Sequence, residues 1–215
     1  DLDRPDRFLN VLLRPQWNSW LVKGGYIITI FGLLVTVWLV MNLLDIQVGN
    51  TILLWGTALF GVLLAIYTAF LFAQAKGRDF WQSPTLPLHM LVHSLMAGAG
   101  IFMIVSIIIG LNDWMALLKN IMIASLIINL LSVITELTIT HPTTSAKAVV
   151  KMITKGRYKS LFWWGTILMG NIIPLVVLFT TQNDILMGVS GLLVLIGIIL
   201  TEKIWVEAPQ RIPLA

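Results

Sequence analysis

Six long stretches of this 215-residue sequence carry almost no charged side chains and consist mainly of aliphatic and aromatic residues. Each is about as long as the roughly 20 apolar residues that a helix needs to cross a bilayer. Backbone polar groups in lipid must be paired within their own segment, so these stretches are predicted to be helices. We place the six spans at residues 20–44, 51–75, 87–110, 114–137, 161–181 and 185–205.

The composition supports the same fold class. Hydrophobic residues make up 58% of the chain and charged residues 11%, whereas a soluble domain carries about 25% charged residues. The sequence therefore predicts an all-α, multi-pass integral membrane protein. It contains no cysteine, which excludes a thiolate-held iron–sulfur cluster within this chain. Any such centre is expected on a partner subunit.

The basic residues gather in the connections on one side of the predicted spans. Of the 14 lysines and arginines, only Lys119 lies elsewhere, and the opposite connections carry Asp45, Asp113 and Asp184. By the positive-inside rule, this pattern places both ends of the chain on the cytoplasmic side. Topology thus explains the basic charge, and no nucleic-acid partner is expected. The basic run 147–159 also fits a docking surface for an acidic partner.

One helical face of the fourth span is polar. Ser125, Asn129, Ser132 and Glu136 are spaced 4, 3 and 4 residues apart, so they lie on one side of a helix. One interpretation is a polar stripe that packs against a neighbouring helix. The other is a proton path through Asn129 and Ser132 that ends at Glu136, because an intramembrane carboxylate suggests function. Both interpretations remain open at this stage.

The three histidines all lie near the basic side. His89 and His93 are one turn apart in the third span, and His141 follows the fourth span. Two histidines on one helix face cannot ligate opposite faces of one haem, so a haem would require His141 as well. We expect one of the pair to pack and the other to face a polar pocket, with no metal in this chain.

Two further positions carry polar groups within spans. Tyr67 lies on a face shared with Phe60 and Gln74, where it is either an interfacial anchor or a hydrogen-bond donor to a carbonyl ligand. Asn171 and Pro174 predict a kink in the fifth span with a freed carbonyl. A transporter-type binding break is the alternative, although no second span shows a matching interruption.

Several stretches together resemble the NrfD family, the membrane subunits of polysulfide reductase-type complexes. The opening DLDRPDRFL is similar to the family's Asp-Leu-Gly-Arg-Pro loop, with Asp3 in place of the glycine. The segment from Tyr67, YTAFLFAQAKGRDFWQSPTLPLHMLVHSLMAGAG, is similar to its Tyr-Thr-Gly…Trp…Pro segment, with Ala69 in place of glycine. The stretches GRYKSLFWWGTILMGNIIPL and GLLVLIGIILTEKIWVEAPQRIPLA resemble its last two spans and tail.

The resemblance implies an eight-helix bundle, of which residues 1–215 form a single transmembrane domain with six helices. In the family the Asp-Leu-Gly-Arg-Pro loop follows the second span. Two helices of that bundle are therefore expected to be missing from this sequence or supplied separately, and residues 1–19 are expected to form an interfacial loop. Within that loop, Asp3 and Arg4 are expected to pair at the mouth of a pocket.

The resemblance also implies a function. Family members exchange electrons between membrane quinol and a ferredoxin-like iron–sulfur subunit, which serves a catalytic subunit in a respiratory chain. The implied quinone, menaquinone or ubiquinone, binds reversibly, and no haem or metal is expected. Tyr67 matches the family's quinone-contacting tyrosine, with His89 or His93 assisting. The expected location is the prokaryotic cytoplasmic (inner) membrane. A passive membrane anchor and an ion- or solute-translocating protein are the alternatives.

Overall fold

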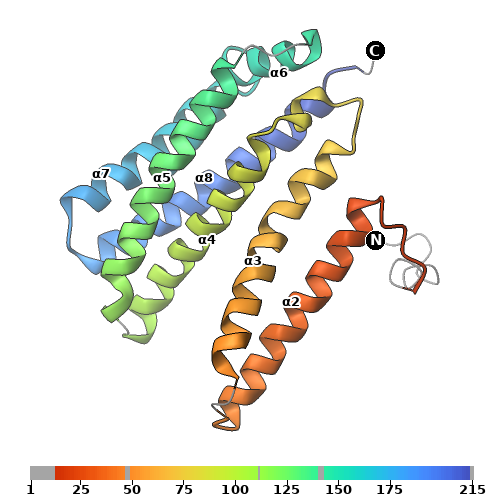
Figure 1. The fold of residues 1–215 in the computed structure, drawn as a ribbon. Helices are drawn as coiled ribbons and strands as arrows, with labels where there is room; N and C mark the ends of the chain where they lie inside the picture. Colours follow the sequence, from red (N-terminus) through yellow and green to blue (C-terminus); the bar gives the residue numbers. More distant parts are fainter. Residues whose placement is uncertain (1–12, 47–48, 111, 140–142, 214–215) are drawn as a thin grey trace. The chain divides into compact units, whose positions relative to one another are not determined.

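The computed structural model describes residues 13–46, 49–110, 112–139 and 143–213, and these are helical apart from short connections (Figure 1). The α-helices are α2 (Trp20–Leu43), α3 (Asn50–Ala73), α4 (Leu86–Ile109), α5 (Met115–Thr138), α6 (Thr144–Thr154), α7 (Ile173–Thr180) and α8 (Asp184–Gln210). A π-helix, η4 (Leu161–Ile172), precedes α7, and two short 3₁₀ turns are η2 (Asp79–Gln82) and η3 (Asn112–Trp114).

The six predicted spans are confirmed. Six helical segments among the described residues are long and apolar enough to cross a membrane, the fifth being η4 and α7 together. Their outer surfaces are apolar as well: Leu33, Ile52 and Ile108 are each at least 60% exposed. Such surfaces would aggregate in water, but they suit a helix bundle whose solvent is lipid. The chain is a multi-pass membrane protein.

The chain divides into two compact units, residues 1–75 and 76–215. In the first unit, α2 and α3 pack against each other as a hairpin. Trp20 of α2 stacks on Phe70 of α3, with ring centroids 4.4 Å apart. The backbone N–H of Trp20 also donates to Oε1 of Gln74 at 2.9 Å, and Nε2 of Gln74 donates to the carbonyl of Asn18 at 3.1 Å. A single domain over 1–215 stays a prediction.

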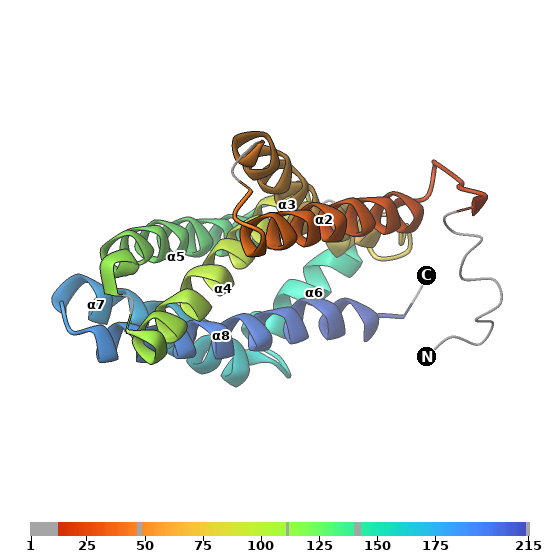
Figure 2. The ribbon, with the colours of Figure 1, turned by 90° about the horizontal axis from the view of Figure 1, so that it is seen from below.

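The second unit is a helix bundle in which α4 packs between α5 and α8, and α8 packs on η4 and α7 (Figures 1 and 2). Its core is made mainly of Met, Leu and Val side chains, among them Met103, Met122 and Leu126. Close approach of the helices depends on glycine pairs. A Cβ on Gly100 would lie 3.1 Å from the carbonyl oxygen of Gly191 in α8, and a Cβ on Gly197 would lie 2.4 Å from the Cα of Gly170 in η4.

The fifth span changes helix type where the sequence predicted a kink. The first part of this span, η4, winds as a π-helix, in which backbone hydrogen bonds join residues five apart. Beside these, the side-chain Nδ2 of Asn171 donates to the carbonyl of Thr166 at 2.7 Å. Pro174 lies in the first turn of α7, which continues η4 without a break, so its missing N–H leaves a carbonyl of the preceding turn without its helical partner. The polar residues at this point therefore accompany a change of helical winding.

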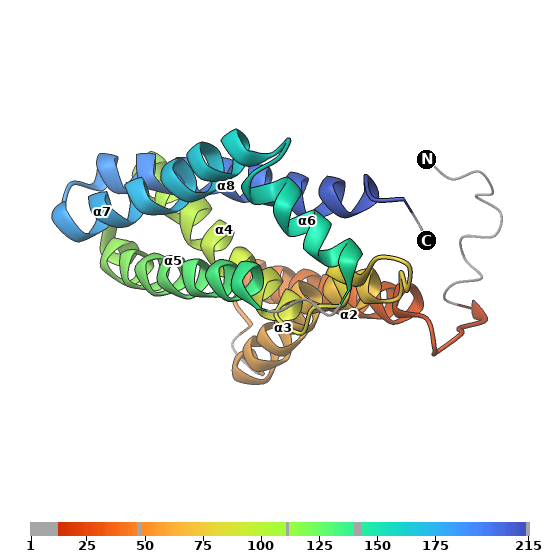
Figure 3. The same cartoon turned by 90° about the horizontal axis from the view of Figure 1, so that it is seen from above.

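Helix α6 is an amphipathic helix at one end of the second unit (Figure 3). Ala146, Val149 and Ile153 are buried, while the basic residues from 147 to 159 are exposed. The hydroxyl of Ser145 donates to Oδ2 of Asp79 at 2.7 Å and so ties α6 to η2. Hydrogen bonds from Ser145 and Thr143 hold the pKa of Asp79 below its usual value. The sequence predicted only a connection here.

Candidate functional site

The second unit concentrates buried ionisable side chains at the end where α4 begins and where α5 and α8 finish. His89 and His93 lie one turn apart on α4, each 4% exposed, with ring centroids 4.0 Å apart. Glu136 lies in the last turn of α5 and is also 4% exposed. Glu202 comes from the final third of α8. Three helices thus bring four protonatable groups to the same end of an otherwise apolar bundle.

His93 and Glu202 form the closest contact in this group. Nδ1 of His93 lies 2.6 Å from Oε1 of Glu202, with the His93 side chain 5% and the Glu202 side chain 32% exposed. A short contact between an imidazole nitrogen and a carboxylate is a charge-assisted hydrogen bond when the ring is protonated. The pair can therefore take up and hold a proton inside the bundle.

His89 is held by an aromatic contact. Its ring stacks on the indole of Trp205 at a centroid distance of 5.3 Å and an interplanar angle of 10°. The indole N–H of Trp81 donates to the backbone carbonyl of Trp205 at 2.8 Å, which fixes this part of α8. Nε2 of His89 and Nε2 of His93 are both buried, and within the described part of the chain neither has a hydrogen-bond partner.

The same residues have the donor chemistry of a metal site. His89, His93 and Glu202 each bring one ligand atom within 4.8 Å of the other two. Imidazole nitrogen and carboxylate oxygen are common ligands for zinc and related ions. The sequence predicted no metal, and the spacing of the histidines alone did not show that a carboxylate from α8 joins them.

Glu136 is held from the loop before α4. The hydroxyl of Ser83 donates to Oε2 of Glu136 at 2.6 Å, and the hydroxyl of Thr85 donates to the same oxygen. Glu136 and His89 both line a narrow cavity between α4, α5 and α8. On its other side, Glu136 borders a groove of about 360 Å³ that is also lined by Asp79 and Thr143. Glu136 therefore connects the inner histidine with the end of the bundle.

The other members of the polar face on α5 have different roles. Nδ2 of Asn129 donates to Oδ1 of Asn171 in η4 at 2.8 Å, so Asn129 links two helices. The hydroxyl of Ser132 donates to the carbonyl of Ile128 at 2.8 Å, and Ser132 lines the same narrow cavity as Glu136. These contacts favour helix packing for Asn129. They leave Ser132 and Glu136 as the members of the predicted proton path that lie near His89.

Tyr67 lies in the first unit, where its partly buried ring faces the backbone of Gly24 in α2. A Cβ on Gly24 would lie only 2.2 Å from Cε2 of the Tyr67 ring, so the glycine makes room for it. No hydrogen bond to the Tyr67 hydroxyl occurs among the residues that the structure describes.

The predicted site residues fall into separate groups. The structure brings together His89, His93, Ser132 and Glu136 in the second unit. Tyr67 belongs to the first unit. Asp3, Arg4 and His141 lie outside the described residues.

Sequence reasoning missed Glu202 and Trp205. A carboxylate in an apolar span was the signal that would have found Glu202, because charge is costly in a membrane. No sequence signal distinguishes Trp205 from an interfacial tryptophan.

Comparison with models of known protein families identifies the family of the chain. The family model described as polysulphide reductase, NrfD, matches residues 1–210. A comparison with curated proteins found no match. The matched range covers nearly the whole chain, and the helical membrane fold agrees with it. The chain belongs to the NrfD family, whose members are membrane subunits of respiratory oxidoreductases.

Proposed function

We propose that this chain binds quinone and quinol in the membrane and exchanges electrons with a ferredoxin-like iron–sulfur subunit, which serves a catalytic subunit. Family membership supports the general role of a respiratory membrane subunit. The proposal of quinone binding and electron exchange rests mainly on the contact between Nδ1 of the buried His93 and Oε1 of Glu202 at 2.6 Å. Proton uptake inside an apolar bundle is what quinol chemistry requires of a membrane subunit.

Oxidation of a quinol releases two protons and two electrons. The electrons pass to the iron–sulfur partner, since this chain has no cysteine to hold a redox cluster. His93 accepts a proton, and Glu202 stabilises the resulting imidazolium through their hydrogen bond. Quinone reduction uses the same residues in the opposite direction. A base with a pKa near the working pH is the most effective for such transfers, and histidine is the usual choice.

Proton release follows from the position of Glu136. This carboxylate lines the cavity beside His89 and borders the groove at the end of the bundle. The hydroxyls of Ser83 and Thr85 donate to it. Glu136 passes protons between the histidine pair and the groove. Ser132 contributes to the same cavity, whereas Asn129 stabilises the packing of α5 on η4.

Tyr67 donates a hydrogen bond to a quinone carbonyl in this proposal. The support is its match to the family's tyrosine together with a hydroxyl that is not engaged within the described residues. The ring is held against Gly24 and is only partly buried. Its contribution is that of one neutral hydrogen bond, about 1 kcal/mol.

The proposed cofactor is menaquinone or ubiquinone, bound reversibly, and this function calls for no haem or metal in the chain. The proposed location is the prokaryotic cytoplasmic membrane, with the basic side of the chain in the cytoplasm. Exposed Lys and Arg residues of the 147–159 segment then face the aqueous phase at the same end as His93 and Glu136. This favours docking of an acidic iron–sulfur subunit on that end.

The test is quinol turnover by the assembled complex with a His93→Gln substitution. Glutamine keeps a polar side chain of similar size but accepts no proton at working pH. We expect turnover to fall about 100-fold, the usual order for loss of a general base. Turnover of the catalytic subunit with a soluble electron donor should remain unchanged, because that reaction bypasses the membrane subunit.

Ser94→Ala is the matched control. Ser94 is the next residue of α4, is exposed and bonds only to the carbonyl of Met90 in its own helix. This variant should retain quinol turnover. If His93→Gln retains it as well, while the complex still assembles, the chain acts as a passive anchor and the proposal is wrong.

A further inference from the structure

We propose that His89, His93 and Glu202 form a binding site for one divalent transition-metal ion of the zinc class at the contact between α4 and α8. Each residue already brings a ligand atom within 4.8 Å of the other two. The site follows from the side-chain geometry of the second unit. It uses the same His93 and Glu202 as the proposed proton transfer, so an ion bound there is expected to block that transfer and quinol turnover while it stays bound.

The two histidines supply the nitrogen ligands. A separation of four residues places both rings on one face of α4, and their centroids are 4.0 Å apart. The same spacing holds zinc in helical two-histidine motifs. Both Nε2 atoms are buried and have no hydrogen-bond partner among the described residues. A buried polar atom without a partner is destabilising, and coordination to a cation removes that penalty.

Glu202 supplies the oxygen ligand and the charge. Two imidazoles and one glutamate form a known zinc ligand set that leaves a fourth position open. The Glu202 side chain is 32% exposed, whereas that of His93 is 5% exposed. An ion is therefore expected to enter the site from the side of the Glu202 carboxylate. Its present contact with Nδ1 of His93 at 2.6 Å shows that the carboxylate reaches this ring, and binding of an ion would replace that contact.

The distances require only small adjustments. Ligand atoms around a tetrahedral zinc ion lie about 3.5 Å apart, given bonds of about 2.0–2.2 Å. Side-chain rotations that move the ligand atoms by about 1 Å bring them from their present spacing to the spacing of a zinc site. The aromatic stack of His89 on Trp205 limits how far that ring turns, so the glutamate and His93 are expected to make most of the movement.

The neighbouring charges favour a cation. Glu136 lines the same cavity as His89 and adds a second carboxylate on the α5 side. Lys203 follows Glu202 in the sequence, but its Nζ lies 3.9 Å from Oε1 of Glu207 and its side chain is 56% exposed. The nearest basic side chain in α8 is therefore directed to another carboxylate.

The test uses the full chain without a histidine tag, purified in detergent, stripped with a chelator and titrated with Zn²⁺ against a chromophoric chelator. We expect one Zn²⁺ per chain. X-ray absorption of the zinc-loaded protein should show nitrogen and oxygen neighbours at about 2.0–2.1 Å with the scattering pattern of two imidazoles. Zinc that is not retained, or that shows no imidazole ligands, overturns the proposal without any need for a variant.

Variants locate the ion. His89→Gln, His93→Gln and Glu202→Gln should each raise the Kd for Zn²⁺ at least about tenfold. Glu207→Gln removes the same charge from α8 outside the cluster and should leave the Kd unchanged. An unchanged Kd in the double variant His89→Gln/His93→Gln overturns the assignment. Zinc binding and quinol turnover are measured separately, so failure of one leaves the other proposal standing.

Discussion

Among single residues, the ring position of Tyr67 depends on the absence of a side chain at Gly24. Its ring occupies the space where a Cβ of Gly24 would lie, 2.2 Å from Cε2. An alanine at Gly24 cannot coexist with that ring position. Because the contact is with a ring and not with backbone, the ring is expected to move while the hairpin of α2 and α3 keeps its fold.

Gly24→Ala should therefore lower quinol turnover by about fivefold to tenfold, the effect of losing one neutral hydrogen bond. The measurement is turnover in the assembled complex, compared with Tyr67→Phe. Gly32→Ala is the control, because a Cβ at this position of the same helix meets nothing within 4 Å. Full activity in both Gly24→Ala and Tyr67→Phe would exclude Tyr67 from quinol binding.

At the scale of helices, the bundle of the second unit is built around α8. Glycine pairs let its backbone approach α4 at Gly100 and Gly191, and η4 at Gly170 and Gly197. Small residues at such contacts are the usual means of helix association in lipid, where apolar side chains gain little by leaving the solvent. The same helix carries Glu202 and Trp205, so its close packing also sets the position of the histidine cluster.

Gly197→Ala should destabilise the bundle by about 1–3 kcal/mol or more, the range for overpacking. The added methyl group would meet the Cα of Gly170 at 2.4 Å, and backbone cannot rotate away as a side chain can. Thermal unfolding of the purified chain in detergent measures the effect. Gly98→Ala in α4 is the control, since a Cβ there meets nothing within 4 Å; equal melting of the two variants would contradict the close contact.

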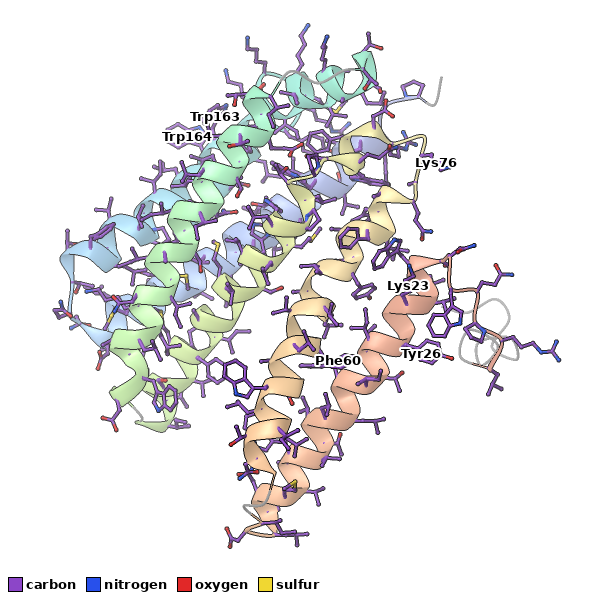
Figure 4. The ribbon with its side chains drawn as sticks, in the orientation of Figure 1. Lys23, Tyr26, Phe60, Lys76, Trp163 and Trp164 are labelled. Carbon is purple, nitrogen blue, oxygen red and sulfur yellow. The ribbon has the colours of Figure 1, made fainter. Side chains whose placement is uncertain are left out.

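At the scale of the whole molecule, aromatic residues mark both ends of the second unit. Trp163 and Trp164 are exposed at the start of η4, on the α6 side (Figure 4), and Trp114 is exposed at the start of α5. Tryptophan side chains prefer the two membrane–water interfaces. In the same region, Nε1 of Trp163 donates to the carbonyl of Thr154 at 3.1 Å. These residues indicate where the bilayer begins and ends along the bundle.

The sidedness of the membrane can be tested with single cysteines, because the sequence contains none. Lys155→Cys and Asp113→Cys lie on exposed residues at opposite ends of the second unit. An impermeant thiol reagent should label Asp113→Cys in intact cells and Lys155→Cys only in inverted vesicles. The unsubstituted chain is the control. The reverse labelling would place the basic side outside the cytoplasm.

The six spans and the helical membrane class could be predicted from the sequence alone. Both follow from the free energy of transferring each stretch of about 20 residues into lipid. That free energy depends only on the residues of the stretch itself and not on contacts with distant parts of the chain. Motifs in the right order also identified the family, which the match over residues 1–210 supports. His89, His93 and Glu136 stood out as candidates because charge and polarity are costly in a membrane.

Which polar groups meet could be seen only in the folded bundle. It brought Glu202 to His93, joined Asn129 to Asn171, and separated Asn129 from the Glu136 end of its own helix face. Such contacts depend on the rotation and axial position of each helix against its neighbours. Those are set by backbone contact at Gly100–Gly191 and Gly170–Gly197, and the periodicity of a single helix carries no information about them.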